Sequence, residues 1–263
     1  MFGGATMKYL VSSLVLMGLM LLQVVSAARA QTTEITLLSP NPIEATINKL
    51  TADFEAKTGI HVKITYGTGV STRKTVASGQ ALDVSLLFAP FPEALKTGNI
   101  DPKSATVVGR LRLAIGVRKG APKPDISTPD AVRRMLRNAK SIVSVDPEQG
   151  SVGGAVLLTL DKLGITQELK PKIKWVPTGG VVQDAVAKGE YEIAFGPYLS
   201  DMRNPGLDVV GALPPEASTP VDITGFLSTS VKDPKAARAL LEYLSSPAVA
   251  PVYESAKIFP VLR

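Results

Sequence analysis

Four stretches of the sequence bring serine or threonine together with glycine or proline at turns where a strand gives way to a helix. They are residues 38–42, 66–72, 145–154 and 177–180. A hydroxyl can donate a hydrogen bond to an anion, and glycine leaves backbone amides uncovered. A helix start adds unpaired N–H groups and about half a positive charge. These turns could therefore hold a small anion.

Helix capping is the simpler interpretation of each turn. Serine and threonine often accept a hydrogen bond from the first turn of a helix. The candidates for capping are Ser39, Ser71, Ser151 and Thr178. Capping does not explain the glycine pairs at 153–154 and 179–180, because glycine weakens a helix and no cap requires it. Taken together, the turns favour anion binding.

The energetics suit one anion that is held by several turns at once. A helix start contributes about 0.3 to 1 kcal/mol, rising to ~2 when partly buried, whereas a micromolar ligand needs ~8 kcal/mol. Charge-assisted hydrogen bonds of roughly 1.5 to 3 kcal/mol each could supply the remainder. Their donors would be Ser39, Thr68, Ser71 and Ser151. No turn reads G-x-x-x-x-G-K-[ST], which excludes a nucleotide P-loop.

Two α/β units are needed to position these turns. Apolar strand-like runs at 35–39, 61–66 and 83–88 alternate with helical periodicity, which predicts a mostly parallel sheet. A second such unit spans about residues 141–196. Ligands of open sheets bind at the carboxyl ends of parallel strands, so the turns of both units could face one cleft.

The fold class we expect is α/β, with two lobes that each contain a mixed, mostly parallel sheet flanked by helices. Extended crossovers near residues 107–117 and 222–230 would join the lobes at a hinge. Helices at 234–245 and 247–255 have no strands of their own, so they should return to the first sheet. Lobe 1 would comprise residues 31–112 and 226–263, and lobe 2 residues 113–225.

The first thirty residues are typical of a secretory signal peptide. Lys8 precedes an apolar run, and Ala28-Arg29-Ala30 offers a cleavage point. The run is short for a spanning helix, so we expect residues 1–30 to be removed and the protein to lie in the periplasm. The chain has no cysteine, which excludes disulfides and thiol chemistry. Its net charge of +6 comes without a basic run that would indicate nucleic acid.

Three motifs carry a resemblance to a known family. They are "KTVASGQALDVSLLFA" at 74–89, "VDPEQGSVGG" at 145–154 and "ALLEYLSSPAVAPVYESAKIFP" at 239–260. In order and spacing they resemble the periplasmic molybdate-binding proteins of ABC importers, which are type II periplasmic solute-binding proteins. The resemblance implies two lobes that close on a small anion, and an ABC permease in the inner membrane as partner. The ligand-contact candidates are Ser39, Asn41, Thr68, Gly69, Ser71, Ser151, Val152 and Val182.

The sequence departs from the family pattern in ways that put molybdate in doubt. Phe195 stands where the family has a tyrosine whose hydroxyl reaches the anion, and Val70 interrupts the family's consecutive serines. Tyr198 could offer a substitute hydroxyl or be an ordinary core or surface tyrosine. If Arg73 faces the cleft, its guanidinium would favour an organic carboxylate or phosphate. The alternative for Arg73 is a solvated helix face.

The residue inventory argues against an enzyme. His61 is the only histidine, so a hydrolytic triad has no obvious base, and the sequence has no metal-binding motif. We therefore expect a monomeric binding protein without cofactor or metal, which captures a molybdate-like oxyanion or a small carboxylate by hinge closure. The alternative function is a periplasmic sensor that reports the same ligand to a signalling receptor.

Overall fold

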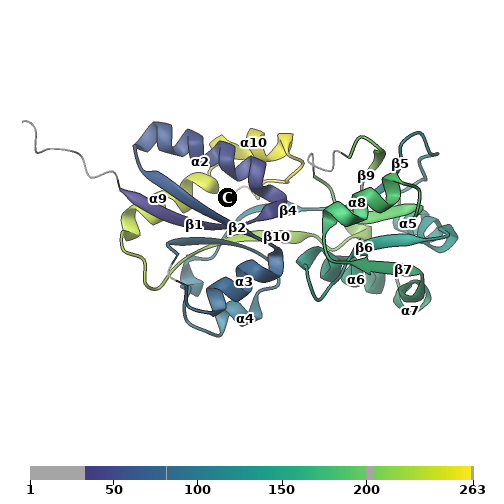
Figure 1. Cartoon of the computed structure of the whole chain (residues 1–263), viewed down its shortest axis with the longest axis horizontal. Coiled ribbons are helices and arrows are strands. Elements are labelled where there is room, and N and C mark those ends of the chain that lie inside the picture. Colours follow the sequence, from purple (N-terminus) through teal and green to yellow (C-terminus); the bar gives the residue numbers. More distant parts are fainter. Residues whose placement is uncertain (1–32, 81, 200–203, 262–263) are drawn as a thin grey trace, which may run out of the picture. The chain divides into compact units, whose positions relative to one another are not determined.

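The structure is a computed structural model that describes residues 33–80, 82–199 and 204–261 of the 263-residue chain. The predicted signal peptide at 1–30 lies outside the described residues. Within them, helices surround two five-stranded sheets (Figure 1). We call the first sheet with its helices lobe 1, and the second sheet with its helices lobe 2. The predicted α/β class with two lobes is confirmed.

Lobe 1 is built on a sheet of strand order β2-β1-β3-β10-β4. The first three of these strands are parallel, whereas β10 is antiparallel to both of its neighbours. The strands are β1 (Glu34–Pro40), β2 (His61–Gly67), β3 (Val84–Phe88), β4 (Thr106–Leu111) and β10 (Val221–Leu227). The helices are α2 (Glu44–Thr58), α3 (Gly69–Ala77), α4 (Pro92–Leu95), α9 (Pro234–Leu244) and α10 (Ala250–Ser255).

Helices cover both faces of this sheet, because successive strand residues point to opposite sides. Leu37 of β1 belongs to the same core cluster as Ile47 of α2 and Leu240 of α9. Its neighbour Leu38 packs with Val76 of α3 in a separate cluster. Figure 1 shows α2, α9 and α10 on one side of the sheet and α3 and α4 on the other. The C-terminal helices thus return to the first sheet, as predicted.

Lobe 2 repeats this plan with strand order β7-β6-β8-β5-β9, in which β5 is antiparallel to both neighbours. The strands are β5 (Leu113–Arg118), β6 (Ile142–Val145), β7 (Ile173–Val176), β8 (Ile193–Pro197) and β9 (Leu207–Ala212). The helices are α5 (Pro129–Asn138), α6 (Ser151–Lys162), α7 (Thr166–Leu169) and α8 (Gly179–Ala187). Short 3-10 helices occupy Asn41–Ile43, Pro102–Ser104, Lys170–Lys172, Pro215–Ala217 and Pro247–Val249.

The chain passes between the lobes at two places, and one differs from the prediction. Between β4 and β5 only Arg112 intervenes, within the range predicted for the first crossover. The second crossover spans residues 213–220, so the prediction of 222–230 is wrong. Val221 pairs with Leu111 of β4, which places residues 221–225 in the lobe 1 sheet rather than in lobe 2. A strand buried inside a sheet and an extended crossover look alike in a sequence, because each is a continuous apolar run.

Arg112 ties the two crossovers together. Its Nη2 donates a hydrogen bond of 2.5 Å to the carbonyl of Leu213, at the start of the second crossover. Its guanidinium also lies over the ring of Phe259, 4.8 Å from the ring centroid. The hinge is therefore held by one side chain that contacts both segments. Among the described residues, no helix has the length and apolar character needed to cross a membrane.

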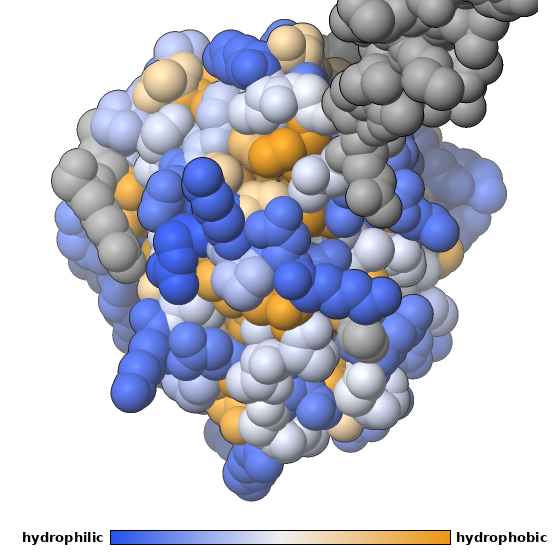
Figure 2. Space-filling view, turned by 90° about the vertical axis from the view of Figure 1, so that its left-hand side faces the viewer, coloured by the Kyte–Doolittle hydropathy of each residue, from blue (hydrophilic) through white to orange (hydrophobic). Residues whose placement is uncertain are grey.

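His61 lies at the far end of lobe 1, where β2 begins. Its ring is 3.1 Å from Glu55 and 3.9 Å from Glu34. Figure 2 shows this end of the molecule, with hydrophilic residues over most of the face and hydrophobic residues scattered between them. At ~3.3 Å per residue, a seven-residue strand puts His61 about 20 Å from Gly67 at the other end of β2. His61 therefore lies beside two surface carboxylates, away from the four serine-, threonine- and glycine-bearing turns.

Candidate functional site

A pocket of about 310 Å³ lies where helices of both lobes begin. We call it the cleft pocket. All four predicted turns meet there. In lobe 1, β1 ends in the turn that contributes Asn41 and Pro42, and α3 follows β2, whereas in lobe 2 α6 follows β6 and α8 follows β7. Since β2, β6 and β7 belong to the parallel parts of their sheets, all three helices start at carboxyl ends of strands. The first turn of each helix has N–H groups without intrahelical partners.

Most predicted site residues line the cleft pocket. Those that do are Asn41, Thr68, Gly69, Ser151, Val152, Val182 and Phe195. Four predicted residues are not part of its lining: Ser39, Ser71, Arg73 and Tyr198. The convergence of the turns therefore follows the sequence expectation closely.

Capping accounts for the hydroxyls of two turns. Thr68 Oγ1 accepts a hydrogen bond from Ser71 N at 3.1 Å, and Thr178 Oγ1 accepts one from Val181 N at 3.5 Å. The hydroxyl of Ser71 donates to the carbonyl of Thr68, so it is used within its own turn. The capping interpretation is thus correct for Thr178. It is wrong for Ser71, which lies within α3, because Thr68 is the cap of that helix.

Ser39 and Ser151 are not helix caps. Ser39 is inside β1, fully buried, and its Oγ has no hydrogen-bond partner among the described residues. An unsatisfied buried hydroxyl costs about 1 to 3 kcal/mol, so its burial needs an explanation other than stability. Ser151 is the first residue of α6, and the capping position before it is Gly150, which has no side chain to cap with. The hydroxyl of Ser151 is therefore free to reach across the cleft.

Arg73 spans the two lobes. Its Nη1 donates a hydrogen bond of 2.5 Å to Ser151 Oγ in lobe 2, and its Nε donates one of 2.5 Å to Glu93 Oε1 in lobe 1. The Arg73 side chain is only 11% exposed. Ser151 Oγ also lies 3.4 Å from the carbonyl of Phe88, a lobe 1 residue, to which it can donate. Arg73 therefore bridges the two lobes beside the cleft pocket without lining it, and a solvated helix face is the wrong interpretation.

Glu93 is held as a carboxylate by this arrangement. Partial burial alone would raise the pKa of the Glu93 carboxyl. A backbone hydrogen bond and the guanidinium of Arg73 outweigh that effect and hold the pKa below its usual value. Glu93 thus remains a carboxylate at neutral pH. Glu93 was not predicted from the sequence, because a single acid at the start of a short helix gives no spacing signal.

The walls of the cleft pocket are apolar with a few amides. Side chains of Phe88 and Val145 join predicted residues such as Phe195, and Gln149 and Gln183 add amide groups. None of the described residues that line it is charged. Burial in such a wall favours a ligand with a carbon skeleton, since apolar surface gains free energy when it leaves water. A charged ligand in this pocket would meet the helix starts, with the guanidinium of Arg73 next to the lining residue Ser151.

The glycines at the start of α6 have different roles. A side-chain carbon added to Gly153 would lie 2.2 Å from the carbonyl oxygen of Val145, so only glycine lets α6 pack this closely. One added to Gly154 or Gly179 would meet nothing within 4 Å. One added to Gly69 would lie 3.4 Å from Ser151 Oγ, which shows how closely the starts of α3 and α6 approach. Close packing thus requires glycine at position 153, whereas positions 154 and 179 have open space around them.

Tyr198, considered from the sequence as a substitute hydroxyl, is not among the residues that line the cleft pocket. Its backbone N–H donates a hydrogen bond of 2.7 Å to the carbonyl of Arg112, next to the first crossover. The next residue, Leu199, lines the cleft pocket instead.

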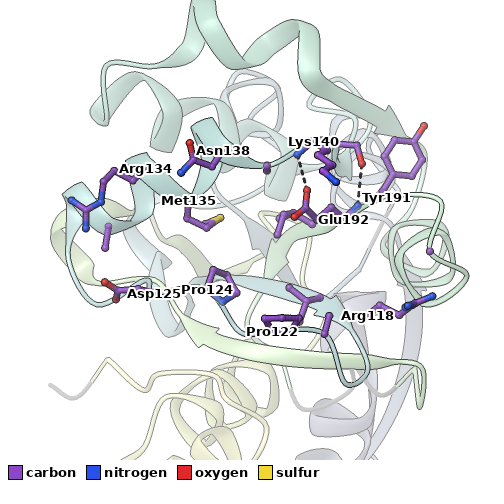
Figure 3. Close-up of a pocket in the computed structure, with 17 residues that line it drawn as sticks. Arg118, Pro122, Pro124, Asp125, Arg134, Met135, Asn138, Lys140, Tyr191 and Glu192 are labelled. Atoms are coloured by element: carbon purple, nitrogen blue, oxygen red, sulfur yellow. Dashed lines mark hydrogen bonds between the residues drawn. The ribbon is translucent and has the colours of Figure 1, made fainter.

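A larger pocket of about 710 Å³ lies elsewhere in lobe 2 (Figure 3). It is where β6 and β8 begin, at the end of the sheet opposite the cleft pocket, and α5 forms one wall. Two carboxylates line it, Asp125 and Glu192, and Glu192 accepts a hydrogen bond from the backbone of Lys140 at 2.6 Å. Figure 3 shows Arg134 and Arg118 at opposite ends of this pocket. We favour the smaller pocket as the functional site, because there helix starts of both lobes converge on buried hydroxyls. Among the described residues, no group of three or more acids and histidines could hold a metal ion.

Comparison with known proteins agrees with this architecture. Residues 35–256 match the family described as bacterial extracellular solute-binding protein. An aconitate isomerase of Pseudomonas sp. is 30% identical over 236 residues, which is 87% of this chain and 88% of the relative. The molybdate-binding protein of Azotobacter vinelandii is 26% identical over 228 residues, 84% of this chain and 88% of the relative.

Solved structures show the same fold. The substrate-binding domain of a putative molybdenum ABC transporter from Clostridium difficile superposes with a TM-score of 0.72 at 16% identity, covering 87% of this chain and 99% of the other. The Azotobacter vinelandii molybdate-binding protein gives a TM-score of 0.67 at 18% identity, covering 87% and 99%. The resemblance to molybdate-binding proteins and the type II two-lobed fold are thereby confirmed.

Proposed function

The chain belongs to the bacterial extracellular solute-binding protein family, and we propose that it captures a small organic carboxylate in the cleft pocket for import. It would act in the periplasm as a monomer and deliver its ligand to an ABC permease in the inner membrane. The observation that carries the proposal is the guanidinium of Arg73, which crosses from lobe 1 to Ser151 beside the helix starts. It puts a positive charge at the place where an anion would meet both lobes.

A carboxylate suits this site better than a bare oxyanion. An arginine fork matches the planar geometry of a carboxylate, and its charge-assisted hydrogen bonds are among the strong ones. The pocket volume of about 310 Å³ is roughly ten times the ~30 Å³ of one water, so a tetrahedral oxyanion would leave much of it unfilled. Phe195 supplies ring surface in place of a hydroxyl, which again favours a ligand with carbon atoms.

The contacts available are enough for a micromolar ligand. Three helix starts at about 0.3 to 1 kcal/mol each, and more when partly buried, contribute a few kcal/mol together. Hydrogen bonds from Arg73 to a carboxylate add roughly 1.5 to 3 kcal/mol each. Burial of the carbon skeleton against Phe88 and Phe195 adds about 25 cal/mol per Å². The buried Ser39 hydroxyl would also gain a partner if a ligand group or an ordered water reached it.

The likeness to an aconitate isomerase suggests which carboxylates to test first. Aconitate is an unsaturated acid with several carboxylates, and the relative spans most of this chain. We propose a ligand of this class. Binding energy shared between the lobes would shift the molecule from an open to a closed state, because only a ligand that contacts both lobes favours closure.

Titration calorimetry against a panel of anions tests the proposal. The panel contains trans-aconitate, citrate, succinate, molybdate and sulfate, and the protein is used without residues 1–30. We expect micromolar binding of at least one carboxylate and at least tenfold weaker binding of molybdate. Tight molybdate binding with no heat from any carboxylate would overturn the assignment of ligand class.

Isomerisation of such an acid is the second candidate function, because the Pseudomonas relative is named as an isomerase. Moving a proton between carbon atoms requires a positioned base. The described residues that line the cleft pocket include no Asp, Glu, His or Lys, and nearby Glu93 is ion-paired with its pKa held low. Binding is therefore the better supported function. Proton NMR of trans-aconitate incubated with the protein should show no cis isomer beyond the uncatalysed level, and its accumulation would favour the enzyme.

Transport and sensing would use the same cleft and differ in the partner that meets the closed lobes. The mild charge of +6 and the lack of a basic run favour a protein partner over nucleic acid. Neighbouring genes for a permease and an ATPase would support import. A neighbouring histidine kinase gene would support the sensor.

A further inference from the structure

We infer that Glu93 is a positioning residue of the ligand site, one that holds the guanidinium of Arg73 in its cleft-crossing orientation. The inference rests on the proposed function in assigning a carboxylate to the cleft pocket. Glu93 itself is not part of the pocket lining. It acts through Arg73, whose Nε donates to Glu93 Oε1 at 2.5 Å.

The N–H groups of Arg73 form two sets, those that hold the guanidinium in place and those that remain. Of the five N–H groups of arginine, the one on Nε is taken by Glu93 and one on Nη1 by Ser151. The guanidinium is planar, so the two hydrogen bonds to Glu93 and Ser151 fix its orientation. The remaining N–H groups therefore point in fixed directions. A carboxylate ligand thus meets a fork whose orientation is already set. This spares the ligand the entropic cost of ordering a long side chain.

The exposures of the two side chains fit a role for Glu93 as the restraint and for Arg73 as the group that meets the ligand. The Arg73 side chain is 11% exposed, whereas the Glu93 side chain is 41% exposed. Glu93 can therefore stay hydrated while it restrains a nearly buried cation. Its pKa is held below the usual value, with the Arg73 hydrogen bond as one cause, so the restraint persists at neutral pH.

A purely electrostatic role for Glu93 predicts the opposite effect of removing it. A negative charge beside an anion site repels the ligand, so loss of that charge alone would strengthen binding. Positioning predicts weaker binding when the acceptor oxygen is removed. It also predicts recovery when glutamine supplies an uncharged acceptor. The signs for the two roles are therefore opposed, and the comparison of Glu93→Ala with Glu93→Gln separates them.

The experiment measures affinity by calorimetry for the carboxylate of the panel that the wild-type protein binds most tightly. We expect Glu93→Ala to weaken binding about tenfold and Glu93→Gln to remain within about threefold of wild type. In an Arg73→Ala background, Glu93→Ala should have no further effect. Glu168→Ala is the matched control, because Glu168 forms a comparable ion pair with Arg137 outside the cleft, at 2.8 Å. Unchanged or tighter binding by Glu93→Ala would overturn the inference.

A second readout does not depend on any ligand. In a nitrogen-15 spectrum of the arginine side chains, the Arg73 Nε–H should exchange slowly with water in the wild type and in Glu93→Gln, but rapidly in Glu93→Ala. Rapid exchange in the wild type would contradict the restraint. If the spectrum behaves as expected and no carboxylate binds, the proposed function fails while the restraint stands. If carboxylates bind and Glu93→Ala binds them normally, the positioning role alone fails.

Discussion

At the scale of single residues, Arg73 has the largest expected effect on ligand binding. Its Nη1 donates a hydrogen bond to Ser151 Oγ, which joins lobe 1 to lobe 2. We expect Arg73→Ala to weaken carboxylate binding by about 10- to 100-fold, because a hydrogen bond to a charged group is worth roughly 1.5 to 3 kcal/mol. Calorimetry checks this, with Arg137→Ala as an exposed control. An unchanged affinity would place the ligand away from Arg73.

Phe195 offers a test in which the substitution should strengthen ligand binding rather than weaken it. It is fully buried and lines the cleft pocket, at the position where the resemblance implies a tyrosine. We expect Phe195→Tyr to raise the affinity for molybdate by roughly tenfold, since the new hydroxyl can donate to an oxyanion. Calorimetry with molybdate before and after the substitution measures the gain. No gain in a variant that melts at the wild-type temperature would refute the correspondence with the family tyrosine.

The residues that the sequence could and could not identify differ in a physical way. Thr68, Gly69 and Ser151 follow from turn chemistry at helix starts, which is local and readable. The partner of Arg73 depends on where α4 lies in space, so Glu93 has no signal in the chain. The side chain of Tyr198 depends on the exact end of β8, and strand ends are the least certain feature of a sequence reading.

At the scale of elements, the start of α6 combines close packing with open backbone. We expect Gly153→Ala to lower the free energy of unfolding by about 1 to 3 kcal/mol, because its new carbon would lie 2.2 Å from the Val145 carbonyl oxygen. Gly154→Ala is the control in the same helix turn, where nothing lies within 4 Å. It should raise stability by about 0.5 to 1 kcal/mol. Urea unfolding of both variants measures the contrast, and equal effects would contradict it.

The order of strands and helices could be predicted because each lobe alternates short apolar runs with helical periodicity. The parallel parts of both sheets and the return of α9 and α10 follow from that pattern. The second crossover could not be located, since β10 is buried in a sheet and reads like an extended connection. β9 was missed altogether, because its residues 207–212 carry few of the alternating apolar positions of a typical strand.

At the scale of the whole molecule, the hinge depends on Arg112. We expect Arg112→Met to lower the free energy of unfolding by about 1 to 3 kcal/mol, because the Leu213 carbonyl loses its donor. Arg118→Met is the control. Arg118 ends β5, is exposed and forms no ion pair among the described residues. Thermal unfolding compares the two. Equal stability of both variants would show that the bond between the crossovers contributes little.

Anion capture by two lobes requires that the ligand contact both of them. In the described residues, the starts of α3, α6 and α8 meet around one pocket, and the guanidinium of Arg73 reaches Ser151 beside it. A closed state would thus be favoured by the free energy of contacts that no single lobe can make. The same arrangement would serve import or sensing, so the partner is decided by surfaces outside the cleft.

A crystal structure with a bound carboxylate of the panel tests the central claim most directly. We predict electron density in the cleft pocket, with a carboxylate within hydrogen-bond distance of Arg73 and of the backbone amides at the starts of α3 and α6. Density in the larger pocket of lobe 2, or a ligand that touches one lobe only, would contradict the account.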